Sequence, residues 1–102
     1  MIRAQFYETN GKLTGFRFSG HSGYAESGRD IACAAYSSAV QLTVNLLDCF
    51  DCHPMPDVRD DLIICKADLS DATDRILSTL RAHFEAILEE FPRTINITVS
   101  EV

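Results

Sequence analysis

Hydrophobic and polar residues alternate along residues 2–8, 12–19 and 95–100, and this period of two predicts three half-buried strands. The pair Asn10-Gly11 separates the first two stretches. Because this pair readily adopts positive φ, it predicts a tight hairpin turn. The alternation of the second stretch changes phase at Gly15, which predicts a β-bulge. We therefore expect the chain to begin with a bulged hairpin.

Two longer segments lack this alternation and predict helices. From about Asp30 to Cys52 the residues are apolar almost all round, which is typical of a largely buried helix. The prolines that follow end this helix, because proline has no N–H group to donate. A second helix, which Ser70 or Asp71 caps, runs to about Phe91 and carries its apolar residues on one face.

A short apolar run, Leu62–Cys65, predicts a further strand between the two helices. The predicted order β-β-α-β-α-β favours a two-layer α+β domain, with two helices on a mainly antiparallel four-stranded sheet. A chain of 102 residues is long enough for one domain and too short for two, so we expect a single domain over residues 1–102. The first helix is apolar on more sides than one sheet face and one neighbouring helix can cover, which favours a homodimer.

The charge balance is acidic, with a formal net charge of −6 and a pI near 4.8. The nine basic residues are scattered along the chain. The sequence therefore lacks the clustered lysine and arginine of a protein that binds nucleic acid directly. An acidic surface fits a basic protein tail as its partner, and solubility alone is an equally open explanation for the acidity.

No apolar run approaches the ~18–20 residues of a membrane span, and the first strand and turn do not have the pattern of a secretion signal. We therefore expect a cytoplasmic protein that makes no membrane contact. Cytoplasmic chains with an adequate core keep their cysteines reduced. Three of the four cysteines, Cys49, Cys52 and Cys65, are expected to be buried apolar residues.

His21 and Cys33 flank a short glycine-bearing loop. A thiol attacks only as thiolate, and a helix start beside a histidinium lowers the pKa of a thiol from about 8.5 to roughly 3.5–7.5. Since the first helix is predicted to begin near Asp30, we expect Cys33 in its first turn, where backbone N–H groups and the helix dipole favour an anion. From the residues alone, a structural histidine and a buried cysteine remain an open alternative.

Residues 20–37 resemble the signature of the bacterial ribosomal-processing cysteine proteases. The matching runs are Gly20-His21-Ser22-Gly23-Tyr24-Ala25 and Gly28-Arg29-Asp30-Ile31-Ala32-Cys33-Ala34-Ala35-Tyr36-Ser37. The resemblance implies that His21 and Cys33 form the catalytic pair, with Asp30 and Ser37 as supporting polar residues, and it also implies a homodimer. This sequence has Ser22 and Ala32 where the family usually has alanine and valine, which affects local packing rather than chemistry.

Two polar residues near the pair have two interpretations each. Asp30 either caps the first helix, since aspartate is a preferred N-cap, or orients His21 as a third catalytic group. Ser37 lies four residues after Cys33 and so shares its helix face, where it either supports the site or bonds back to a helical carbonyl.

The loop itself has the composition of a substrate-binding segment. Tyr24 can form an aromatic wall for an apolar substrate side chain, or it can cover the edge of the core. Glycines at both ends of a loop permit closure over a bound peptide. The predicted substrate-binding residues are Gly20, Gly23, Tyr24 and Gly28.

The string Cys49-Phe50-Asp51-Cys52-His53 has the C-x-x-C-H spacing that attaches c-type haem. Haem attachment takes place outside the cytosol, and the apolar neighbours of this string favour the end of a buried helix. A zinc site needs a second pair of ligands, for which only Cys65 is at hand. We expect no metal and no cofactor.

Taken with the resemblance, the sequence predicts a cysteine endopeptidase that uses a Cys33/His21 dyad. The family removes an N-terminal extension from the large-subunit ribosomal protein numbered twenty-seven during ribosome maturation, so the implied partner is that ribosomal protein precursor. The alternative is a non-catalytic, ribosome-associated module of the same fold that binds a peptide without cleaving it.

Overall fold

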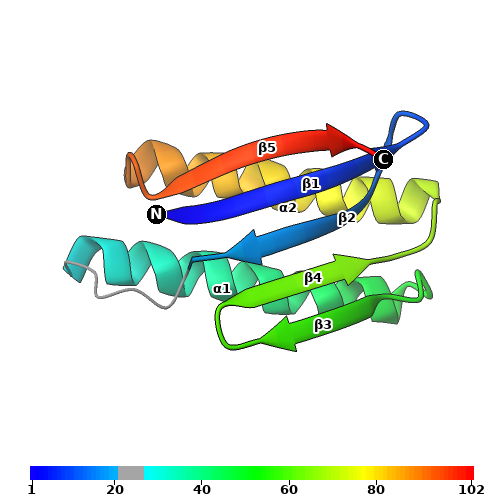
Figure 1. The fold of residues 1–102 in the computed structure, drawn as a ribbon, viewed down its shortest axis with the longest axis horizontal. Helices are drawn as coiled ribbons and strands as arrows, with labels where there is room; N and C mark the ends of the chain where they lie inside the picture. The colour runs from blue at the N-terminus through cyan, green and yellow to red at the C-terminus, as the bar shows by residue number, and fades with distance from the viewer. Residues whose placement is uncertain (21–26) are drawn as a thin grey trace.

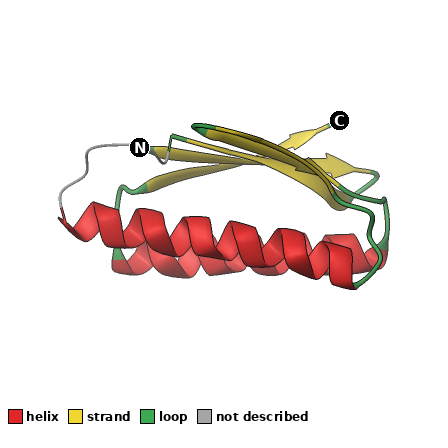
Figure 2. Cartoon of the chain, turned by 90° about the horizontal axis from the view of Figure 1, so that it is seen from below, coloured by secondary structure: helices red, strands yellow, loops and turns green. Residues whose placement is uncertain are grey.

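Two helices cover one face of a five-stranded sheet in the computed structural model of the chain (Figures 1 and 2). The structure describes residues 1–20 and 27–102, and residues 27–30 by their backbone alone. The elements are β1 (Ile2–Thr9), β2 (Lys12–Ser19), α1 (Ser27–Cys49), β3 (Met55–Arg59), β4 (Leu62–Lys66), α2 (Asp71–Glu90) and β5 (Ile95–Glu101). The predicted two-layer α+β class is confirmed.

The sheet has the strand order β3-β4-β2-β1-β5. β1 and β5 run parallel and the other neighbouring pairs are antiparallel, so the sheet is mixed. The predicted four strands in the order β-β-α-β-α-β were therefore one too few. The additional strand, β3, lies at the sheet edge with every residue exposed, so its sequence shows no alternation. Pro56 also argues against a central strand, and an edge is the position where a sheet tolerates proline.

The N-terminal hairpin has the predicted turn and the predicted bulge. Asn10 and Gly11 have φ values of 52° and 79°, as a tight hairpin turn requires. The β1–β2 register shifts between Tyr7 and Glu8, which face Gly15 and Leu13. Gly15 also has no room for a side chain, because a Cβ there would lie 2.7 Å from the carbonyl oxygen of Cys65.

Aromatic rings form the centre of the core between the sheet and the helices. Phe84 of α2 lies with its ring centroid 6.1 Å from that of Phe6, 5.9 Å from that of Phe18 and 5.4 Å from that of Tyr36. All four side chains are buried. Because large rings contribute much of the apolar area of a core, this cluster fixes both helices against β1 and β2.

α1 is less buried than the sequence predicts. Its buried positions form one line along the helix. Large apolar residues on other sides are exposed, namely Ile31 (60%) and Leu42 (59%) of α1 and Phe50 (61%), which directly follows its last residue. Cys49 is exposed as well, so the expectation of three buried cysteines holds only for Cys52 and Cys65. The sequence pattern predicted more apolar sides on this helix than one chain can cover, and the exposed side chains agree with that prediction.

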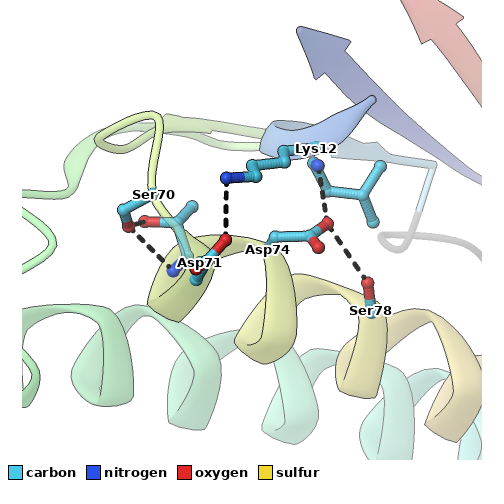
Figure 3. A network of polar contacts seen from close by, with 7 residues as sticks. Lys12, Ser70, Asp71, Asp74 and Ser78 are labelled. Atoms are coloured by element: carbon cyan, nitrogen blue, oxygen red, sulfur yellow. Dashed lines mark hydrogen bonds and ion pairs between the residues drawn. The ribbon is translucent and has the colours of Figure 1, made fainter. Parts of the chain in front are cut away.

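A polar network joins the start of α2 to the β1–β2 hairpin (Figure 3). Ser70 is the N-cap of α2, because its Oγ accepts from the Thr73 N–H at 3.1 Å. Lys12 Nζ lies 2.7 Å from Asp71 Oδ1, and the Leu13 N–H donates to Asp74 Oδ1 at 2.8 Å. Acidic residues in a first helical turn are also favoured by the helix dipole.

Neither helix of the described residues has the length and apolar character that a membrane span requires.

Candidate active site

The end of β2 has a fixed backbone path at Gly20. Its φ is +84°, and a Cβ there would lie 2.8 Å from the carbonyl oxygen of Met1. Its N–H donates to the carbonyl oxygen of Asp61 at 3.3 Å. Glycine is therefore required at this position by both conformation and space. The predicted site residues that follow, His21, Gly23 and Tyr24, lie outside the described residues.

α1 begins three residues earlier than the sequence predicts, at Ser27. Gly28 therefore lies in the helix rather than in the loop. Asp30 is the fourth helical residue, so the interpretation of Asp30 as an N-cap is wrong. Cys33 lies in the second turn instead of the first. Since the field of a helix terminus falls off within the first turn, the dipole favours a thiolate at Cys33 less than expected.

Cys33 lies half-buried on α1 and packs against the edge of the core. Its neighbour Ala32 is fully buried, so the thiol lies beside the line of α1 that faces the sheet. Ser37, one turn further along, is also half-buried. Residues four apart share a helix face, so the structure brings Cys33 and Ser37 together as predicted.

Tyr36 ties this part of α1 to the opposite end of the chain. Its Oη lies 2.7 Å from Thr94 Oγ1, and Thr94 Oγ1 donates to the carbonyl oxygen of Phe91 at 2.7 Å. Because the single hydroxyl proton of Thr94 is used on Phe91, Tyr36 is the donor in the first bond. The Ile2 N–H completes the connection by donating to the Thr94 carbonyl oxygen at 3.2 Å.

This anchor holds the turn of α1 that follows Cys33 against the core. Tyr36 is fully buried, and its ring meets Phe84 edge to face at an interplanar angle of 85°. Burial raises the pKa of the Tyr36 phenol, the hydrogen bond to Thr94 opposes this rise, and negative charge on Cys33 adds to it. Tyr36 is therefore a neutral donor that lies within electrostatic reach of the thiol. No local pattern indicates this role of Tyr36, because its partner Thr94 is 58 residues away.

Asp61 is a second residue that the sequence did not single out. It lies in the turn between β3 and β4, and its carbonyl oxygen holds the N–H of Gly20. The turn therefore brings a carboxylate close to the residue that immediately precedes His21. The adjacent acids Asp60 and Asp61 were visible in the sequence, but only the β2–β4 pairing places them at the end of β2.

The C-x-x-C-H string is split by the fold. Cys52 is buried, whereas Cys49 and His53 are exposed. The His53 Nδ1 atom lies 2.6 Å from Asp68 Oδ2, and this hydrogen bond raises the pKa of the imidazole, with the Asp68 charge adding to the rise. Among the described residues, no group of three or more His, Cys, Asp or Glu side chains is arranged to hold a metal ion.

The model of one protein family, cysteine protease Prp, matches residues 1–96. The chain belongs to the cysteine protease Prp family. As a member of this family, it is a cysteine protease. The match extends over both helices and into β5. No curated protein matches the chain.

Three solved structures share the fold of this chain over 98% or more of its length. A Streptococcus mutans protein, SMU.848, has 25% identity and a TM-score of 0.80, covering 100% of this chain and 96% of that chain. The essential ribosomal processing protease Prp of S. aureus in complex with a substrate peptide has 23% identity and a TM-score of 0.85. The same protease with a covalently linked product peptide has 24% identity and a TM-score of 0.84. Each S. aureus match covers 98% of this chain and 100% of that chain.

A Prp protease needs one thiol that can ionise and meet a substrate, and the four thiols of this chain differ in that respect. Cys52 and Cys65 are buried, and burial raises the pKa of the Cys65 thiol. Cys49 is exposed but is the last residue of α1, where the helix carbonyl groups disfavour an anion. Cys33 is half-buried in the N-terminal part of α1. Its position suits a nucleophile best.

Proposed function

We propose that this Prp protease is a cysteine endopeptidase in which Cys33 is the nucleophile and His21 is its base. The observation that carries the proposal is the position of Cys33, the thiol near the N-terminus of α1 that is neither fully buried nor at the negative end of the helix. His21 directly follows Gly20, whose backbone is fixed at the end of β2. The loss of dipole support in the second turn makes the histidine the more important source of positive charge.

The proposed reaction has two steps. In the first, His21 takes the thiol proton, the Cys33 sulfur attacks the peptide carbonyl carbon, and the imidazolium then protonates the leaving amine as the C–N bond breaks. In the second, water attacks the thioester with His21 as its base, which releases the carboxylate product and returns the thiol. Backbone N–H groups at the start of α1 or in the glycine-rich loop would bind the oxyanion.

The proposed substrate is the N-terminal extension of the large-subunit ribosomal protein numbered twenty-seven, cleaved in the cytoplasm during ribosome maturation. Support comes from the fold shared with a ribosomal processing protease that has been captured with a substrate peptide and with a covalently linked product peptide. Gly20, Gly23, Tyr24 and Gly28 would contact this peptide around the scissile bond.

Two carboxylates are candidates for orienting His21. Asp30 lies on the first turn of α1, and Asp61 lies beside Gly20. A carboxylate next to an imidazolium favours the charged form and fixes the ring. The test compares Asp30→Asn with Asp61→Asn. The variant that lacks the orienting carboxylate should have a lower imidazole pKa, so the acidic limb of its pH–rate profile should shift to lower pH. The other variant should keep that limb in place. Ser37 would support the thiol side of the site.

The protease is also proposed to act as a homodimer. An apolar groove of about 460 Å³ lies between α1 and α2. It is lined by Leu42 and Leu46 of α1, by Phe50 just after α1, and by Ile76 and Leu80 of α2, among others. Exposed apolar surface of this extent is typical of an interaction site. A second copy would cover it with the same apolar side chains.

The direct test is digestion of a peptide that spans the cleavage site of the precursor, followed by mass spectrometry. We expect the native protein to produce two fragments and the Cys33→Ala variant to produce none. Binding by both proteins without cleavage by either would replace the endopeptidase with the peptide-binding module. A Cys49→Ala variant is the matched control and should cleave like the native protein.

A further inference from the structure

Four of the five cations of the strands lie on the outer face of the sheet, which we define as the face turned away from α1 and α2 (Figure 2), and the fifth, Lys12, is paired with Asp71 of α2. Arg3 and Arg17 alternate with buried residues of β1 and β2, and Lys66 follows the buried Cys65 of β4, so all three point outward. The only acid at the described outward positions of the strands is Asp57, which is paired with Arg59 at 3.2 Å. By contrast, α2 carries five acids and two arginines.

Arg3 and Arg17 lie close together on neighbouring strands. Arg3 faces Ser19 and Gln5 faces Arg17, so the two arginines are diagonal neighbours across the β1–β2 pair. Long side chains in this arrangement reach one another, and two like charges repel. Within the described residues, neither guanidinium makes a hydrogen bond or ion pair. The repulsion would be relieved by an anion that both groups bind.

Two open hollows surround this arginine pair. One, of about 360 Å³, is lined by Arg3, Gln5, Arg17, Ser19, Asn96 and Thr98. The other, of about 450 Å³, is lined by Met1, Arg3, Arg17, Ser19, Gly20, Asp61 and Leu62. Since the two arginines and Ser19 belong to both, the hollows form one trough across β5, β1, β2 and β4. Amide and hydroxyl groups line the part of the trough over β5 and β1. Asp61 lies at the other end, which we call its near part, beside Gly20.

The trough leads to the candidate active site. Its near part includes Gly20, the last described residue before His21. An extended peptide advances by about 3.3 Å a residue, so a few residues suffice to pass from the trough over the end of β2 toward α1. The polar lining suits a peptide backbone, and paired guanidinium groups suit a carboxylate.

We propose that Arg3 and Arg17 bind a carboxylate side chain of the peptide substrate, a few residues from the scissile bond. This inference rests on the proposed endopeptidase function and names a specificity determinant for it. Four cations on a whole sheet face, of which Arg59 is already paired with Asp57, are too few for tight binding of nucleic acid at physiological salt, where affinity depends on the number of phosphates neutralised. The outer face therefore recognises an acidic residue, while the acidic helix side remains available for basic segments.

The test uses fluorescein-labelled peptides that span the precursor cleavage site, with a single Glu or its matched Gln placed at each position in turn. Binding to the Cys33→Ala variant is measured by fluorescence anisotropy, and KM and kcat are measured with the active enzyme. At one position we expect Glu to bind about fivefold more tightly than Gln at low salt, with the difference in KM and not in kcat. The Arg3→Gln/Arg17→Gln double variant should lose this preference, and the Arg81→Gln variant, altered on α2, should keep it.

The outcomes separate the two proposals. Cleavage of every peptide with no preference for Glu, or a preference that persists in the double variant, would overturn the carboxylate site and leave the endopeptidase intact. Binding with a Glu preference but no cleavage would support the carboxylate site and overturn the endopeptidase function. If a single-stranded RNA oligonucleotide binds more tightly than any peptide and depends on the same two arginines, the trough is a nucleic-acid site and the inference is wrong.

Discussion

Tyr36 ties the part of α1 that carries Cys33 to Thr94, near the start of β5, through one buried hydrogen bond of 2.7 Å. The signature over residues 20–37 indicated Cys33 and its neighbours from local sequence, because the chemistry of a thiol and an imidazole needs those residue types close together. Tyr36 stood inside the same signature without any sign of its role. Its hydroxyl donates to Thr94, and only folding brings these two residues together. Long-range anchors of this kind have no local pattern.

Replacing Tyr36 with phenylalanine tests this anchor. The ring contact with Phe84 is retained and one buried hydrogen bond is lost, so we expect the free energy of unfolding to fall by about 1 kcal/mol. Urea denaturation provides the measurement. Tyr7→Phe is the control and should change stability much less. Tyr7 is half-buried on the outer face and makes no side-chain hydrogen bond among the described residues. Equal effects of the two changes would contradict the anchor.

The ion pair of His53 with Asp68 predicts a pH-dependent contribution to stability. The hydrogen bond to Asp68 raises the pKa of His53 above its usual 6.5, and the charges of Asp68, Asp51 and Asp48 add to the rise. A raised folded-state pKa means that the contribution is complete below pH 6.5 and is lost as the pH rises through the folded value.

We therefore expect His53→Gln to lower the melting temperature at about pH 5.5 and to have little effect at about pH 9. Thermal unfolding followed by circular dichroism provides the measurement, and Asp68→Asn should reproduce the same pH dependence. A difference in melting temperature that is constant across this range would show that the ion pair adds no stability.

At the scale of elements, alternation and turn chemistry predicted most of the sheet. The Asn10-Gly11 turn, the bulge opposite Tyr7 and the Ser70 cap are local features, and all three are confirmed. β3 was missed because an edge strand with both faces exposed has no hydrophobic pattern. The parallel pairing of β1 with β5 was missed because alternation shows which residues face the core and leaves the neighbouring strand undetermined.

The contact between the hairpin and α2 gives a prediction at this scale. Asp74→Ala leaves the Leu13 N–H without its acceptor, in a part-buried position, and should lower the free energy of unfolding by about 1–3 kcal/mol. Asp74→Asn keeps a neutral acceptor and should recover part of this loss. Asp71→Ala removes only the exposed pair with Lys12, and its effect should be smaller and should vanish in high salt. Urea denaturation of the three variants checks this order.

At the scale of the whole molecule, the two layers present different surfaces. The sheet turns four of its five cations outward, and the helices combine an acidic surface with the apolar groove between them. The net charge of −6 concealed this sorting, because total charge says nothing of its distribution. The sequence did predict that α1 needs more cover than one chain supplies, and its exposed side chains agree with that need.

Charge introduced into the groove should separate the proposed dimer. We expect Leu42→Glu and Phe50→Glu to convert a dimer to a monomer in sedimentation velocity, since an unpaired carboxylate is costly in an apolar interface. Val58→Glu is the matched control, because Val58 is 69% exposed on β3, away from the groove, and this change should leave the assembly unaltered. A native protein that sediments as a monomer would contradict the proposed dimer.

The most direct test of the account is the alkylation rate of each cysteine as a function of pH, resolved by mass spectrometry. Cys49, exposed at the end of α1, provides a second accessible thiol in the same molecule for comparison. If Cys33 is a nucleophile activated by His21, its rate will reach half of its maximum well below the usual thiol pKa of about 8.5, and His21→Ala will move that midpoint up toward the Cys49 value. A Cys33 profile that matches Cys49 and does not respond to His21→Ala would contradict the assignment of the catalytic pair.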